Sequence, residues 1–218
     1  MQAPVSYKLM QQQLWLSADR CIFWEEEKIL IVSDLHFGKT GHFRKSGIAV
    51  PQSVYKKDLQ RLFNQVQFFK PRKLIVVGDL FHSRENKELE LFLKWRNDFP
   101  DLEIHLVRGN HDILHKSWYS LAGIHVIEDE LQITQFRFRH DKEVALQSQA
   151  SYLFSGHIHP GIRISGMGRQ SLRLPCFYFA RDFCVLPAFS AFTGTYLMDP
   201  DEGENIFAIV ENKIVQLQ

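Results

Sequence analysis

The chain has little cysteine, no long hydrophobic run and almost no net charge, and each shortage excludes a class of protein. Three cysteines occur in 218 residues, and their number and spacing fit neither a disulfide framework nor a zinc site. No stretch approaches the roughly 20 apolar residues of a membrane-spanning helix, and the N-terminus lacks the basic and apolar regions of a secretory signal. We therefore expect a cytoplasmic protein with free thiols and no membrane contact.

The net charge of +1 creates no global field that would attract nucleic acid. Binding of a polyanion would therefore require a local basic patch. Histidine is the unusual component of the composition, with ten residues. Most of them lie near glycines and carboxylates at the ends of predicted strands, which makes these strand ends the candidate functional positions.

The length predicts one domain, residues 1–218. Three continuous β-branched runs in the first half are typical of buried parallel strands, and two segments between them have helical spacing. The strands are expected at 28–34, 73–79 and 102–110, and the helices at 52–69 and 86–97. From about residue 124, strand-like runs follow one another without a clear helix. This order predicts an α/β (α+β) fold in which two β-sheets pack face to face.

Each of the three buried strands ends in a polar cluster. These clusters are "SDLH", "GDLFH" and "GNHD", and the β-rich half adds "RFRH" and "SGHIHP". The carboxyl ends of parallel strands line one crevice, and in extended backbone residues i and i+2 project to the same side. Asp34 with His36, and His157 with His159, are therefore each expected to offer two ligands to one point.

No single cluster identifies a site, because a lone histidine at a strand end is usually structural and Gly-Asp is a common turn. Together, however, uncompensated carboxylates and imidazoles would cost several kcal/mol per charged group to desolvate. Divalent cations supply the counter-charge, and this ligand chemistry suits Mn, Fe, Zn, Co or Ni without distinguishing among them. The set exceeds what one tetrahedral zinc needs and fits two ions that share a carboxylate. The candidate ligands are Asp34, His36, Asp79, Asn110, His140, His157 and His159.

The ordered set D-x-H, G-D, G-N-H-D, H and G-H-x-H, between residues 34 and 159, resembles the signature of the calcineurin-like metallophosphoesterases. The resemblance implies two mixed β-sheets with flanking helices, the four-layer sandwich of that family. It implies these ligand roles: Asp34, His36 and His159 for the first metal, Asn110, His140 and His157 for the second, and Asp79 as the bridge.

Three longer stretches narrow the resemblance. "DLHFGKTGHFRKSGIAVP" (34–51), "GDLFHS" (78–83) and "LPAFSAFTG" (186–194) are similar to the bacterial ligase-associated DNA damage response endonucleases, the PdeM group. This likeness implies a manganese-dependent phosphodiesterase or nuclease that is associated with a DNA ligase and a helicase. DNA is then the expected substrate.

The expected chemistry is in-line attack of a metal-bridging hydroxide on phosphorus, with both ions neutralising the oxygens of the transition state. His111 cannot easily bind the same ion as its neighbour Asn110, so it is the candidate general acid that protonates the leaving oxygen. Asp112 is expected to hold the His111 ring and raise its pKa. Capping of the next helix by Asp112 is a compatible alternative.

Four further residues are candidate substrate contacts. His42 and Arg44 lie in a basic loop after the first motif and are candidates for contact with a phosphate backbone, although a solvated loop is the alternative. His82 and Arg84 follow the second motif and are expected to meet substrate.

Two rival functions stay open at this point. One is a phosphatase or diesterase acting on a small nucleotide or a lipid-linked phosphate, which near-neutral charge would suit. The other is a scaffold of the same fold that binds partners without turnover. Steep salt dependence would indicate DNA, and equal inertness of metal-free and Mn-loaded protein on bis-nitrophenyl phosphate would indicate the scaffold.

Overall fold

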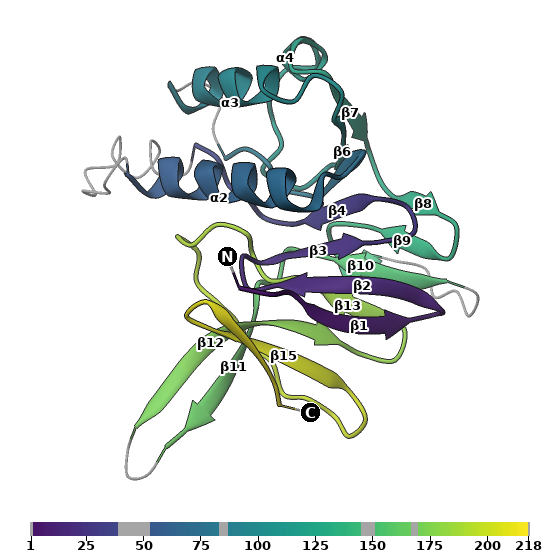
Figure 1. Ribbon diagram of the computed structural model, residues 1–218, viewed down its shortest axis with the longest axis vertical. Helices are drawn as coiled ribbons and strands as arrows, with labels where there is room; N and C mark the ends of the chain where they lie inside the picture. Colours follow the sequence, from purple (N-terminus) through teal and green to yellow (C-terminus); the bar gives the residue numbers. More distant parts are fainter. Residues whose placement is uncertain (1, 39–52, 83–86, 145–150, 167–169, 218) are drawn as a thin grey trace.

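The computed structural model describes residues 2–38, 53–82, 87–144, 151–166 and 170–217. Two mixed β-sheets pack face to face, and the helices lie on the outer face of the first sheet (Figure 1). The predicted fold class is confirmed. None of the helices in the described ranges is long and apolar enough to span a membrane.

The first sheet has seven strands in the order of the sequence, antiparallel from β1 to β4 and parallel from β4 to β7. Its strands are β1 (Val5–Leu9), β2 (Gln12–Ser17), β3 (Cys21–Trp24), β4 (Ile29–Val32), β5 (Lys73–Val77), β6 (Glu103–Val107) and β7 (Ile124–Ile127). The helices are α2 (Ser53–Phe69), α3 (Lys87–Asn97) and α4 (Lys116–Leu121). The three predicted parallel strands and the two predicted helices are confirmed, whereas the short helix α4 was not predicted.

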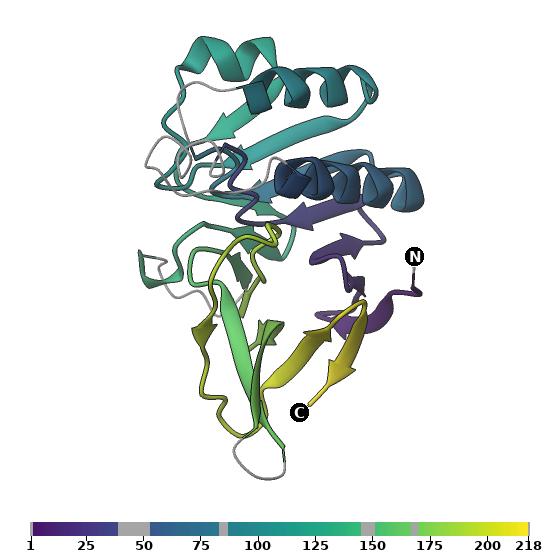
Figure 2. The same cartoon turned by 90° about the vertical axis from the view of Figure 1, so that its left-hand side faces the viewer.

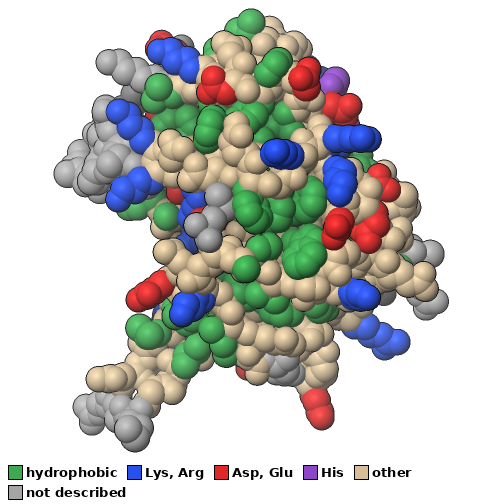
Figure 3. Space-filling view, in the orientation of Figure 1, with side chains coloured by type: hydrophobic (Ala, Val, Ile, Leu, Met, Phe, Trp, Pro, Cys, Tyr) green, Lys and Arg blue, Asp and Glu red, His purple; other side chains and the backbone are tan. Residues whose placement is uncertain are grey.

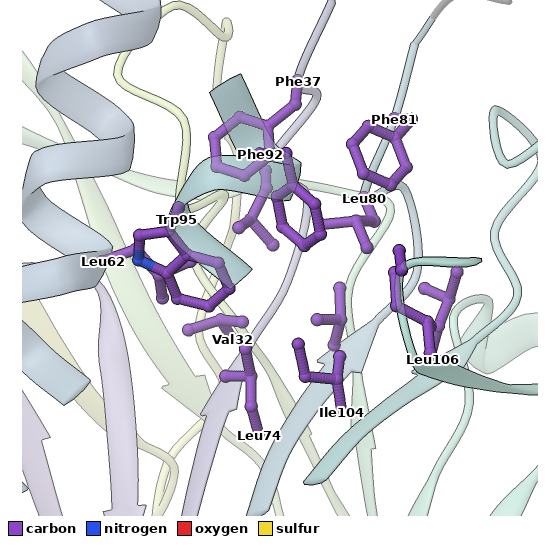
Figure 4. Packing of buried hydrophobic residues seen from close by; sticks show 14 of the residues in the cluster. Val32, Phe37, Leu62, Leu74, Leu80, Phe81, Phe92, Trp95, Ile104 and Leu106 are labelled. Atoms are coloured by element: carbon purple, nitrogen blue, oxygen red, sulfur yellow. The ribbon is translucent and has the colours of Figure 1, made fainter. Parts of the chain in front are cut away.

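The parallel strands are apolar on both faces because each face is covered. Val32, Leu74 and Ile104 face the helices, where they pack in one cluster with Leu62 of α2 and Phe92 of α3 (Figure 4). Burial on both faces is the reason that these strands appear in the sequence as continuous apolar runs rather than alternating ones.

The opposite face of the first sheet packs on the second sheet. Ile31 and Ile75 belong to this inter-sheet cluster, together with Phe136, Phe154 and Phe177 from the second sheet. Alternate residues of β4 therefore point into two separate cores. The position of the parallel strands between the cores fixes where their carboxyl ends lie.

The second sheet has nine strands, with the path β14-β11-β12-β13-β10-β9-β8 and with β15 and β16 joined beside β12. They are β8 (Leu131–Ile133), β9 (Phe136–Phe138), β10 (Tyr152–Ser155), β11 (Pro160–Ser165), β12 (Ser171–Phe179), β13 (Phe183–Val185), β14 (Tyr196–Leu197), β15 (Asn205–Val210) and β16 (Lys213–Gln216). A 3-10 turn lies at Lys142–Val144. The β11–β12 hairpin extends away from the body of the molecule (Figure 2).

Candidate metal centre

The first group of predicted ligands comes from the end of β4 and from the loop before β11. Asp34 Oδ1 lies 3.2 Å from His159 Nε2, and His36 Nε2 lies 3.3 Å from the same nitrogen. His36 Nε2 is 3.9 Å from Asp34 Oδ1. One ligand atom from each of the three residues lies within 4.8 Å of the other two, so one ion can contact all three.

The second group surrounds His140, which follows β9. His140 Nε2 lies 3.3 Å from Asn110 Oδ1, 3.3 Å from His157 Nδ1 and 3.4 Å from Asp79 Oδ2. Asp79 Oδ2 is also 4.0 Å from His36 Nδ1. The Asp79 carboxylate therefore lies between the two groups, and the structure brings all seven predicted ligands together.

The electrostatics of the centre fit a divalent cation. Asp34 and Asp79 are buried, and among the described residues neither carboxylate has a lysine or arginine partner. Burial alone would raise the pKa of Asp79, but the hydrogen bond and charge of His140 lower it to about 2. Burial would lower the pKa of His140, yet Asp79 and Asp34 raise it to about 9. The two carboxylates thus favour a positive charge at the position of His140. A metal ion bound there would displace the proton and supply that charge itself.

The ligands converge by a different backbone geometry from the one that the motif spacing suggested. Asp34, His36, Asp79, His157 and His159 have φ values of 53°, 49°, 52°, 66° and 54°. These are left-handed conformations, so the expectation that i and i+2 meet through extended backbone is wrong. Such conformations are uncommon outside glycine and asparagine and cost of order 1 kcal/mol or more each. Their concentration at one place is typical of a functional site.

Two glycines are needed because other motifs approach them closely. A Cβ at Gly109 would overlap the carboxylate and the backbone nitrogen of Asp79, and a Cβ at Gly156 would overlap the Ser33 hydroxyl and lie 2.6 Å from Asp34 Oδ2. The glycines of "RGNHD" and "SGHIHP" therefore allow the ligand segments to touch.

His111 lies beside the metal centre. Its backbone N–H donates to Asp79 Oδ1 at 2.9 Å, and its ring centroid is 5.6 Å from that of His36. The His82 ring is 4.3 Å from the His111 ring. His82, a predicted substrate contact, is therefore in contact with the candidate proton donor.

Asp112 has a different role from the predicted one. Its Oδ2 accepts from the backbone nitrogens of Asp79 at 2.8 Å and Gly109 at 2.9 Å, and its Oδ1 accepts from that of Phe81 at 3.1 Å. Asp112 makes no hydrogen bond to the His111 ring, and the N-cap of α4 is His115. Both sequence interpretations of Asp112 are corrected: the carboxylate ties the ends of β5 and β6 together. Burial raises its pKa to about 7, against the opposing effect of its N–H donors.

Three predicted substrate contacts, His42, Arg44 and Arg84, lie outside the described residues. Sequence reasoning assigned no site role to the stretch "LPAFSAFTG", which borders the centre. The backbone nitrogens of Phe189 and Ser190 donate to the carbonyl oxygens of Ser33 at 2.7 Å and Asp34 at 3.1 Å. No side-chain pattern marks these backbone bonds, so the sequence carried no signal for them.

The centre opens to solvent on the side of its second group. Asn110 and His157 are exposed, and a cavity of about 180 Å³ adjoins them and His140. Arg139 also lines this cavity. Arg108 lines it as well, together with the carboxylates of Glu128, Asp129 and Asp141, and the cavity has room for a group of the size of a phosphate beside the second ligand group.

Comparison with known proteins agrees with this geometry. The sequence matches the calcineurin-like phosphoesterase family over residues 27–149, more than half of the chain. The structure is similar to that of nuclease MPE from Pseudomonas putida, with a TM-score of 0.83 and 27% identity, covering 98% of this chain and 100% of that one.

Two other solved structures are more distant. Yfce, a phosphoesterase from E. coli, has 14% identity and a TM-score of 0.47, covering 87% of this chain and 97% of its own. The protein of unknown function AQ665 from Aquifex aeolicus has 16% identity and a TM-score of 0.43, covering 65% and 82%. No curated relative matches the sequence. The ligand geometry and the family match together identify the chain as a member of the calcineurin-like phosphoesterase family and as a metal-dependent phosphoesterase.

Proposed function

We propose that this phosphoesterase is a two-metal nuclease that hydrolyses phosphodiester bonds in DNA during repair, as a member of the PdeM group. The observation that carries the proposal is the position of Asp79 Oδ2 between the two ligand groups, 4.0 Å from His36 Nδ1 and 3.4 Å from His140 Nε2. The likeness to a structure described as a nuclease, at 27% identity over nearly the whole chain, supports a nucleic acid as substrate. The likeness of the stretches 34–51, 78–83 and 186–194 to the PdeM group supports a cytoplasmic role beside a DNA ligase and a helicase.

In this proposal the two ligand groups hold separate ions. Asp34, His36 and His159 would hold the first, Asn110, His140 and His157 would hold the second, and Asp79, which lies between the groups, would be shared by both. Manganese is the metal that the PdeM likeness favours, and Fe, Zn, Co and Ni share its ligand preferences. When bound, such ions supply Lewis acidity and lower the pKa of water towards neutrality.

His111 supplies the proton. Its backbone N–H is fixed on Asp79 at 2.9 Å, which holds the residue beside the bridging carboxylate. The ring is half-buried and packs on His82, so it can contact a substrate while its orientation stays restricted. We infer that His111 donates a proton to the oxygen of the leaving nucleotide. Asp112 supports this step indirectly, because it holds the backbone of Asp79 in place.

Substrate approaches from the exposed side of the second group. The cavity beside Asn110 and His157 receives the scissile phosphate, and Arg139 at its wall offers a positive charge. His82 contacts substrate next to His111. His42, Arg44 and Arg84 are proposed to contact the flanking phosphates.

The test compares Mn-loaded wild type with His111→Ala on single-stranded DNA, duplex DNA, a phosphate monoester and bis-nitrophenyl phosphate. A general acid contributes about 10²- to 10⁴-fold when the leaving group is a poor one. We expect His111→Ala to lose activity on DNA by a factor in this range. Hydrolysis of bis-nitrophenyl phosphate should change much less, because nitrophenolate leaves without a proton. His125→Ala, at an exposed histidine on β7, is the matched control.

Three outcomes contradict the proposal. Equal losses on DNA and on bis-nitrophenyl phosphate would remove the proton-donor role of His111. Hydrolysis of the monoester but of no diester would indicate a phosphatase. Absence of activity on every substrate, with or without manganese, would favour the scaffold.

A further inference from the structure

The β11–β12 hairpin starts directly at the metal centre. Its first residue, Pro160, follows the predicted ligand His159. The hairpin stands out at the lower left of the surface in Figure 3. Among the described residues, only the outer part of the hairpin, at 162–165 and 171–174, has no further strand beside it, whereas 176–179 of β12 pack in the hydrophobic clusters. The exposed side chains of this outer part are therefore the ones that are informative about binding.

Two arginines face each other across this hairpin. Arg163 of β11 is directly opposite Arg173 of β12 in the antiparallel register, and both are exposed. Neither forms an ion pair or hydrogen bond with any residue of the described ranges. Like charges directly opposite each other destabilise a β-ribbon. Their unpaired placement therefore requires an explanation outside the fold, and an anionic ligand provides one.

The arginines lie on the same face of the hairpin as Gly161, next to Thr195. A Cβ at Gly161 would overlap Thr195, so this face of β11 is the one turned towards Thr195. Arg163 is two residues further along the strand and projects from the same face. Thr195 belongs to the stretch of chain that is hydrogen-bonded to Asp34 at one end and to His159 at the other. This stretch of chain therefore joins the base of the hairpin, on the face that carries the arginines, to Asp34 and His159 of the metal centre.

From these contacts we propose that the hairpin is an arm that binds the phosphate backbone of a nucleic-acid strand through Arg163 and Arg173, outside the metal centre. Opposite side chains have Cβ atoms about 5 Å apart, so one phosphate can accept from both guanidinium groups. Arg163 is four residues beyond His159, a distance of about 13 Å along a strand. A strand cleaved at the metal centre reaches the arm with a neighbouring phosphate, whereas a small diester does not.

This inference rests on the proposed function for its ligand, and a binding experiment separates the two. Binding of a fluorescein-labelled single-stranded DNA oligonucleotide is measured by anisotropy in EDTA, which prevents cleavage, at several salt concentrations. The variants are Arg163→Gln/Arg173→Gln and, to retain charge, Arg163→Lys/Arg173→Lys. The matched control is Arg181→Gln/Lys213→Gln, which removes two exposed charges elsewhere, one in the turn between β12 and β13 and one on β16.

The expected result is a change in salt dependence. Each phosphate contact contributes about 0.7 to the slope of log affinity against log salt for a single strand. Loss of two contacts lowers the slope by about 1.4. When salt rises from about 50 to 200 mM, the affinity of the variant should therefore fall by a factor about seven times smaller than that of wild type. The lysine variant should keep most of the slope, and the control should keep all of it.

Three results would each overturn the proposal that the hairpin binds DNA. They are an unchanged slope in the glutamine variant, an equal change of slope in the control, and no binding by wild type. Cleavage of DNA by Mn-loaded wild type is assayed separately. If wild type cleaves DNA and the glutamine variant keeps the wild-type slope, the inference fails and the proposed function stands. If wild type binds with the expected slope difference but hydrolyses no diester, the arm stands and the proposed function fails.

Discussion

The substitution Asp112→Asn distinguishes a structural role for Asp112 from control of His111. Asp112 is 1% exposed, and its two oxygens accept three backbone N–H groups. An asparagine keeps the shape but offers only one acceptor oxygen. If that oxygen takes the Oδ2 position, the bonds from Asp79 and Gly109 remain. The amide NH₂ then faces the N–H of Phe81, so a donor meets a donor.

The magnitude follows from that one broken bond. A buried donor left without an acceptor costs about 1–3 kcal/mol. For a chain of this length, about 2 kcal/mol corresponds to a fall in Tm of roughly 4–8 °C. Asp112→Ala would leave all three donors without acceptors. The resulting loss in free energy of unfolding should approach the total stability of a typical domain, about 5–15 kcal/mol. The asparagine variant is therefore the more informative one.

The assay is urea and thermal unfolding followed by far-UV circular dichroism, in EDTA and again with manganese. The exposed carboxylate Asp98 provides the control, since Asp98→Asn should change the free energy of unfolding by less than about 0.5 kcal/mol. The reasoning would be refuted by an Asp112→Asn variant as stable as wild type whose rate–pH profile had shifted. That result would mean that the carboxylate acts on His111 after all.

Three further outcomes are expected. Gly156→Ala should fold but bind less manganese by elemental analysis, because the added methyl overlaps the Ser33 hydroxyl and crowds Asp34; full metal content would contradict this. Leu62→Ala, at a fully buried position of the helix–sheet core, should lower the free energy of unfolding by about 2–5 kcal/mol in urea titrations without changing metal content. EDTA should abolish bis-nitrophenyl phosphate hydrolysis and lower the Tm, and added manganese should restore both, since binding to the native state alone stabilises it.

The fold was largely predictable because burial on both faces leaves a direct mark on sequence. The apolar runs that became β4, β5 and β6 are continuous for that reason, and the α2 spacing reflects one buried face. Helix α4 was missed because six residues are too few to show a periodicity. The convergence of the candidate ligands could be predicted because several polar clusters at neighbouring strand ends, unlike any one of them alone, are hard to explain structurally.

The local geometry of the centre was not predictable in the same way. The motif spacing suggested extended backbone at Asp34 and His36, whereas both have positive φ. The partners of Asp112 are backbone N–H groups, which every residue but proline carries, so no residue pattern could reveal them. The contact of Ser190 with Asp34 joins positions far apart in the chain through backbone atoms alone. Sequence patterns report side-chain burial and chemistry, but not which backbone groups meet.

Hydrogen bonds between the motifs hold the ligand residues in their left-handed backbone conformations. Unfavourable φ values persist only where the surroundings over-determine the conformation. Here the Asp34 N–H donates to the Gly78 carbonyl at 3.1 Å and the His36 N–H to the Asp79 carbonyl at 2.9 Å, while Asp112 holds the Asp79 N–H. Asp34 and His36, which follow β4, are therefore fixed by the end of β5, and Asp79, which follows β5, is fixed by the segment after β6. Since these bonds involve protein groups only, the carboxylates are oriented by the fold itself, and little ordering free energy is left to oppose the binding of an ion.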